Sequence, residues 1–144
     1  MSDLYDEDIV LWSERQSELL RRRAAGEPVN EAELDWPHIA DEIESVGSEQ
    51  RFAVESLLVQ AIVPILKAQA WPDCRDVENW LADSMRFRGD AAARFVPSMR
   101  QRIDLGRIHI RALRAMPRAI DGQPAPSPDP ICPFTLDWLL SEEP

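Results

Sequence analysis

Apolar residues recur at helical spacing along most of the first 116 positions, and this periodicity constrains the fold more than any other feature of the sequence. A single tyrosine and few alternating runs of β-branched residues leave little that predicts strands. The chain has 144 residues, which is the usual length of one domain. We therefore predict an all-α fold, in which residues 1–116 form a helical bundle of four to five main helices.

Start and break signals divide this periodic region into helices. Acidic residues fill the first turn of an expected helix that begins near Asp6, and Asp35 is placed to cap a second helix. Gly47 either ends this second helix or leaves a weak point in one long helix, and Pro64 is expected to kink it. The predicted helical segments are residues 6–25, 35–70 (continuous or interrupted, and ended by Trp71, Pro72 and Asp73), 76–96 and 99–116.

The character of the chain changes after residue 116. Six of the 12 prolines fall between Pro117 and Pro133, a density that is typical of an extended connector. A short amphipathic segment, residues 134–140, follows and is expected to form a helix that docks back onto the bundle. We therefore predict two parts, a bundle at 1–116 and a proline-rich connector with a short helix at 117–144, packed together as one domain.

The compartment is predicted from features that the sequence lacks. The acidic N-terminus has neither the basic nor the apolar region of a secretory signal. The uncharged run at 56–66 has 11 residues, whereas a membrane-spanning helix needs about 20. Cys74 and Cys132 have no metal-binding or disulfide spacing, so we expect free thiols. These features favour a cytoplasmic protein without a membrane partner.

The net charge of −10 argues against a protein built to bind a polyanion, but the charge is unevenly distributed. Residues 86–118 contain nine arginines and two acidic residues. On a continuous helix, five of these arginines would lie within about 60° of one another. Such a stripe could be a solvated face, pair with the protein's own carboxylates or bind an acidic protein, and nucleic acid is the least favoured partner. Its members are Arg100, Arg107, Arg111, Arg114 and Arg118.

A second polar set is predicted near the N-terminus. Asp8, Trp12 and Gln16 are spaced to form one ridge on the first helix. Glu42 and Glu44 flank the apolar stripe of the next helix, and a half-buried Arg51 would need a carboxylate partner. The set predicts either a structural ion-pair network or a ligand-binding or acid–base site between helices.

Several short motifs carry a resemblance that runs in order along nearly the whole chain. They are YDED at 5–8 followed by Trp12 and Gln16, DW at 35–36, EIESVGSEQR at 42–51, ILK at 65–67, PS at 97–98 and CPFT at 132–135. The chain thereby resembles the bacterial domain-of-unknown-function family twenty-nine. The resemblance implies an all-α, bundle-like fold and no established activity, and it adds Lys67 to the candidate ligand-binding residues. Where the family usually has a histidine, this chain has Pro64, which weakens an interpretation as a metal enzyme.

The two histidines give little support to a cofactor. His38, Asp41 and Glu42 have a spacing that could hold a divalent metal on one helix, but no second ligand set follows. His109 is expected to point inward from the last long helix. We therefore expect no metal and no cofactor.

The predicted function is a protein-interaction or binding module, with self-association as one form of it. The alternative is a small-ligand-binding protein or enzyme that uses Asp8, Gln16, Glu42 and Arg51.

Overall fold

The computed structural model describes residues 3–144, whose contacts divide the chain into two compact units. We call them unit 1 (Met1–Ser48) and unit 2 (Glu49–Pro144). The boundary between the two units lies at residue 48, a position that was not predicted as a boundary, and residues 117–144 belong to unit 2, where Leu136 and Leu139 join its core. Helix, with one two-stranded hairpin, accounts for the regular structure of the described residues, so the all-α prediction is confirmed.

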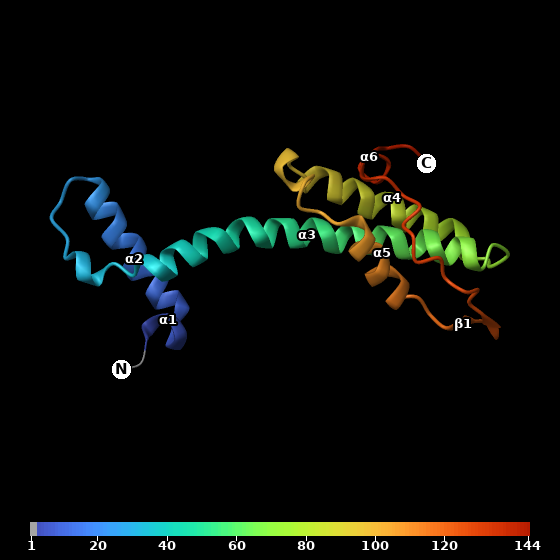
Figure 1. Cartoon of the computed structure of the whole chain (residues 1–144), viewed down its shortest axis with the longest axis horizontal. Coiled ribbons are helices and arrows are strands. Elements are labelled where there is room, and N and C mark those ends of the chain that lie inside the picture. The colour runs from blue at the N-terminus through green and yellow to red at the C-terminus, as the bar shows by residue number, and fades with distance from the viewer. Residues whose placement is uncertain (1–2) are drawn as a thin grey trace. The chain divides into compact units, whose positions relative to one another are not determined.

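Unit 1 contains α1 (Leu4–Glu7), α2 (Ile9–Ala24), the 3₁₀ turn η1 (Glu31–Glu33) and the start of α3 (Trp36–Ala70), drawn from blue to cyan in Figure 1. The predicted helix at 6–25 is therefore two helices. Asp8 separates them, because its backbone leaves the helical region and its carboxylate accepts from the amide of Leu11 at 3.0 Å, which caps α2. The core of this unit consists of Trp12, Leu34 and Ile39.

Helix α3 is continuous over 35 residues, and neither Gly47 nor Pro64 ends it. By length and composition alone this helix is long and apolar enough to cross a membrane. Within unit 2, however, its residues Val54, Leu58 and Ile62 are fully buried, which is typical of the core helix of a folded domain.

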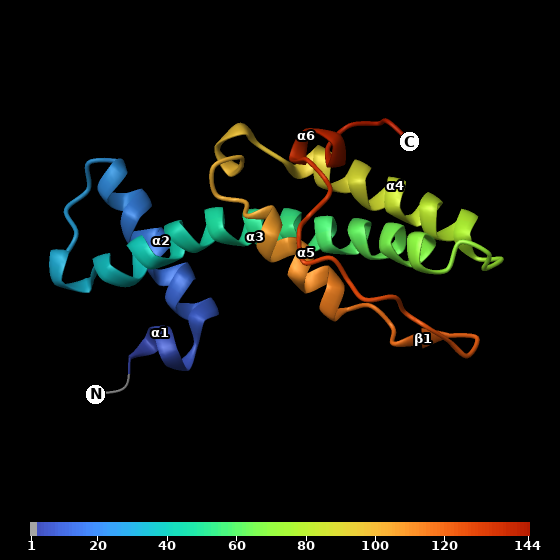
Figure 2. The same cartoon turned by 45° about the vertical axis from the view of Figure 1, so that its right-hand side comes forward.

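Unit 2 packs α4 (Val77–Arg94) and α5 (Leu105–Arg114) against the C-terminal part of α3. Figures 1 and 2 both show α4 running alongside this part of α3. After α5 the chain forms a hairpin of β1 (Ala119–Ile120) and β2 (Gln123–Pro124), in which Asp121 and Gly122 both have positive φ. The helix α6 (Leu136–Leu139) follows, close to its predicted position, and buries Leu136 and Leu139. The core is completed by Ala91, Met99, Ile108 and Ala112.

The predicted helix at 99–116 is wrong in its first turns. Residues 97–99 form the 3₁₀ turn η2 (Pro97–Met99), and α5 begins only at Leu105. Asp104 starts it, because its carboxylate accepts from the amide of Arg107 at 3.3 Å. Arg100 and Arg118 therefore lie outside α5, and the predicted stripe is reduced to Arg107, Arg111 and Arg114.

Candidate functional site

The indole of Trp12 is the centre of a hydrogen-bonded network in unit 1. Its Nε1 donates to Asp35 Oδ2 at 2.9 Å. One turn further along α2, the Gln16 amide accepts from the backbone N–H of Asp35 at 2.9 Å and donates to the carbonyl of Glu33 at 3.0 Å. Trp12 and Gln16 are both buried. These bonds fix the path of the chain into α3. Trp12 and Gln16 therefore both stabilise the loop that precedes that helix.

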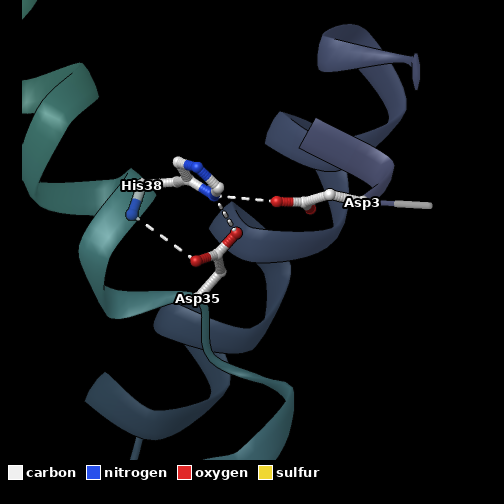
Figure 3. A group of neighbouring side chains, drawn as sticks. All are labelled: Asp3, Asp35 and His38. Carbon is white, nitrogen blue, oxygen red and sulfur yellow. Dashed lines mark hydrogen bonds and ion pairs between the residues drawn. The ribbon is translucent and has the colours of Figure 1, made fainter. Parts of the chain in front are cut away.

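His38 joins this network from the first turn of α3. Its Nδ1 lies 2.7 Å from Asp35 Oδ2 and 3.4 Å from Asp3 Oδ2, and Figure 3 shows both carboxylates directed at this nitrogen while the second ring nitrogen points away. The hydrogen bond to Asp35 raises the pKa of His38. Burial raises the pKa of Asp35, but hydrogen bonds from His38 and Trp12 outweigh it, so this pKa is lowered. Both shifts favour an imidazolium between two carboxylates.

Tyr5 covers the other side of this histidine. Its ring stacks on the imidazole with the ring centres 3.8 Å apart and the planes 6° from parallel. Its hydroxyl donates to Glu42 Oε1 at 2.5 Å, and this hydrogen bond is the main reason that the pKa of Tyr5 is raised to about 12. Tyr5 and Glu42 thus connect α1 to the second turn of α3.

Titration of Tyr5 tests this contact directly, because it is the only tyrosine in the chain. We expect the near-ultraviolet absorbance of tyrosinate to appear with an apparent pKa of about 12, above the ordinary value of 10.0. The raised pKa favours the neutral phenol, so its contribution to stability is present below pH 10.0 and is lost as the pH rises through about 12. In Glu42→Ala the apparent pKa should fall towards 10.0. Glu44→Ala is the control, and an equal fall in both variants would contradict the contact.

Asp3, Asp35 and His38 each place one potential metal-ligand atom within 4.8 Å of the others. Existing interactions already occupy these atoms, however. His38 Nδ1 binds Asp35, Asp35 Oδ2 also accepts from Trp12, and the second oxygen of Asp3 caps α1 through the amide of Tyr5. A metal would have to displace the proton of His38. The geometry fits a structural connection between α1 and α3 better than an open ligand site.

A cavity of about 710 Å³ lies in unit 2, between the end of α3, one face of α5 and the proline-rich segment. His109 lines this cavity and is 1% exposed, so it points inward as predicted. Its Nε2 lies 2.8 Å from the carbonyl oxygen of Asp129, which can only accept, so this nitrogen carries a proton. Its Nδ1 is buried and has no hydrogen-bond partner among residues 3–144.

Comparison with known families places the chain. The family model described as "Domain of unknown function DUF29" matches residues 4–143. The chain belongs to the DUF29 family. This DUF29 protein is also similar to a crystallised alpha-helical protein of unknown function from Rhodospirillum rubrum, with 26% identity and a TM-score of 0.68. The match covers 99% of this chain and 92% of that one. No curated protein matches significantly.

The polar set predicted for the N-terminal half is only partly assembled in this DUF29 protein. Trp12 and Gln16 share the network described above, and Glu42 reaches it through Tyr5. Asp8 is a helix cap, and Glu44 is exposed. Membership of Tyr5, Asp35 and His38 in one network was not predicted, although the helix-start signal at Asp35 marks the place where they meet.

Two other candidate residues of the DUF29 chain lie in unit 2 and have local partners there. Arg51 Nε faces Glu55 on the next turn of α3 at 3.9 Å, and its guanidinium lies over the ring of Phe52. Lys67 places its ammonium 4.6 Å from the centre of a Trp80 ring. Both contacts are typical of structural packing, and neither residue belongs to the network around Trp12.

The arginines predicted to form one stripe have three different environments in this DUF29 structure. Arg100 pairs with Asp137 at 2.8 Å, and Arg118 lines the cavity described above. Arg107, Arg111 and Arg114 follow the spacing i, i+4, i+7 on α5 and are exposed. We call these three the arginine face. Among residues 49–144, no carboxylate forms an ion pair with any of them.

Proposed function

We propose that this protein is an interaction module that self-associates, with the arginine face of one copy bound to the acidic surface of unit 1 in a second copy. The observation that carries this proposal is the division of charge between the units. Residues 1–48 contain 13 acidic and four basic residues, a net charge of −9, whereas residues 49–144 contain 13 and 12, a net charge of −1. Each copy therefore has both a strongly acidic unit and a basic helix face that forms no ion pair among residues 3–144.

Exposed apolar side chains identify the region of unit 1 that a partner would cover. Ile43 is 70% exposed and Val46 is 62% exposed, and one turn of α3 separates them on the same face. The exposed Asp41 and Glu44 lie beside them. Apolar side chains surrounded by charges of one sign are typical of a surface that binds a partner with the opposite charge. The arginine face meets this requirement.

A second copy fits these observations better than nucleic acid does. A nucleic acid could neutralise the arginine face, but the charge of −9 on unit 1 of the same chain would repel it. A second copy provides the acidic surface and the basic face together, and a reciprocal contact of this kind closes into a symmetric dimer.

Sedimentation at several protein and salt concentrations tests the proposal. We expect a reversible dimer that dissociates as salt is added, because exposed charge pairs are screened. Arg107→Glu/Arg111→Glu/Arg114→Glu should weaken dimerisation at least about tenfold, since three exposed pairs of about 0.2–1 kcal/mol each are replaced by repulsion. The matched control is Arg75→Glu/Arg86→Glu/Arg94→Glu, which makes the same change of charge at exposed arginines away from the arginine face.

A charge exchange identifies the partner surface. Asp41→Arg/Glu44→Arg should also be monomeric alone, and a mixture of this variant with the triple glutamate variant should form a mixed dimer.

A wild-type protein that is monomeric at every salt concentration would contradict self-association. Dimers unaffected by the triple substitution, or a mixture that stays monomeric, would contradict the proposed surfaces. If a monomer binds duplex or single-stranded nucleic acid through the arginine face, nucleic acid and not a second copy is the partner of that face.

A further inference from the structure

We infer that the cavity of unit 2 binds a small apolar carboxylic acid that also carries a hydrogen-bond donor. The cavity volume of about 710 Å³ lies within the range of about 300–1,000 Å³ that is usual for small-molecule sites. Leu66, Leu113 and Met116 form much of its wall, together with prolines of the segment that follows the hairpin. Such a wall takes the apolar body of a ligand, while a few polar groups determine its orientation.

The first of these polar groups is the Nδ1 atom of His109. Nε2 carries the proton that binds the carbonyl of Asp129, and in the Nε2-protonated tautomer of an imidazole Nδ1 is an acceptor. It has no donor among the described residues, although the side chain is 1% exposed. Buried polar atoms of native proteins nearly always have a partner, so an acceptor without one at a cavity indicates a missing donor. A ligand O–H or N–H group would supply it.

The second polar group belongs to Arg118, a residue that lines the same cavity. Arg118 is exposed and forms no ion pair among residues 49–144. Asp129 also lines the cavity, but its carboxylate accepts from the amide of Ile131 at 2.9 Å. Arg118 is therefore a cation without an ion-pair partner among residues 49–144, at a cavity whose wall combines apolar side chains with a few polar ones, and a carboxylate is the group that pairs with it best.

Three matched probes separate these two contributions. 4-Hydroxyphenylacetate has both the acid and the donor, phenylacetate has the acid alone, and 4-hydroxyphenylacetamide has the phenol without the acid. Each is titrated into the full-length protein and followed by the amide resonances of the backbone. We expect 4-hydroxyphenylacetate to bind about fivefold or more tightly than either of the others. The perturbed resonances should lie in the stretches that line the cavity, residues 109–118 and 125–133.

Arg118→Gln provides the variant test, because Arg118 is exposed and its loss should leave the fold intact. This variant should bind the acid no more tightly than the amide, while its weak binding of the amide should be unchanged. Arg94→Gln removes an exposed arginine that does not line this cavity and should leave all three affinities unchanged. The inference is overturned if no probe perturbs the cavity residues, if the three probes bind equally, or if Arg118→Gln binds the acid as the wild type does. Neither His109 nor Arg118 belongs to the arginine face, so a failure of this test is independent of the proposed self-association.

Discussion

Replacing Arg88 with methionine is expected to destabilise unit 2 by about 3 kcal/mol, although methionine is close to arginine in length and is well tolerated in helices. Arg88 is only 3% exposed on α4, and no acidic residue forms an ion pair with it in the described chain. Burial lowers the pKa of this guanidinium, and the charge of Glu143 opposes that effect. The energetic role of Arg88 must therefore come from the groups to which it donates.

Those groups are carbonyls at the end of α6. Arg88 Nε donates to Leu139 at 3.2 Å, and Nη2 donates to Trp138 at 2.7 Å and to Ser141 at 3.1 Å. Carbonyls in the last turn of a helix have no partner within the helix, and bonds from a charged donor are the stronger kind. The guanidinium also lies 3.8 Å from the centre of a Trp138 ring. Methionine would remove the donor from the carbonyls of Leu139 and Ser141, whereas the Trp138 carbonyl would keep its hydrogen bonds from Ser141.

Urea denaturation of the wild type and of three variants measures this effect. Arg86→Met is the matched control, because Arg86 lies on the same helix, its side chain is 65% exposed, and its ion pair with Asp83 is long at 3.4 Å. This control should change the free energy of unfolding by less than about 0.5 kcal/mol. Arg88→Lys keeps the charge but not the branched donor, and it should fall between the wild type and Arg88→Met. Equal effects of Arg86→Met and Arg88→Met would show that the carbonyl contacts contribute nothing.

The sequence predicted the helices well where local signals and apolar periodicity agree. The helix at 76–96 is observed as α4, and the short helix near the C-terminus is observed as α6. The start of α5 was misplaced because apolar spacing continues back to Met99, whereas the cap at Asp104 depends on a single carboxylate. That one contact removes Arg100 from the helix, and Arg118 lies beyond its C-terminal end, so the predicted basic surface changes.

The division into units could not be predicted from periodicity. Ile43 and Val46 are three residues apart on α3 and Val54 and Leu58 are four apart, and both spacings are helical, yet the first two are exposed and the last two are fully buried. The difference arises from which other segments pack against each turn, and this depends on contacts between residues far apart in the sequence. The same limit applies to the network around Trp12. Its ridge with Gln16 was predictable, but its hydrogen bond to Asp35 depends on the path of the loop between α2 and α3.

Replacing Trp12 with alanine is expected to unfold unit 1, at a cost of about 3–5 kcal/mol. Among residues 3–48, three apolar side chains are buried in the core of this unit, Trp12, Leu34 and Ile39, and Trp12 is the largest of them. The substitution also removes the indole donor from Asp35 and the edge-on contact with Tyr5, whose ring centre lies 4.9 Å away. The other apolar side chains that pack against this core are only partly buried, so a core this small cannot compensate for such a loss.

Hydrogen exchange of the backbone amides locates the effect of Trp12→Ala. We expect protection to be lost in α1 and α2 while the amides of α4 and α5 remain protected, because unit 2 has a separate core. Trp36→Ala is the matched control. It removes the same side chain from a position that is 46% exposed, where the main contact is Arg23 lying over the ring, so protection in α2 should be retained. Loss of protection throughout α4 and α5 in Trp12→Ala would instead show that the two units unfold together, and that the core of unit 2 depends on the network around Trp12.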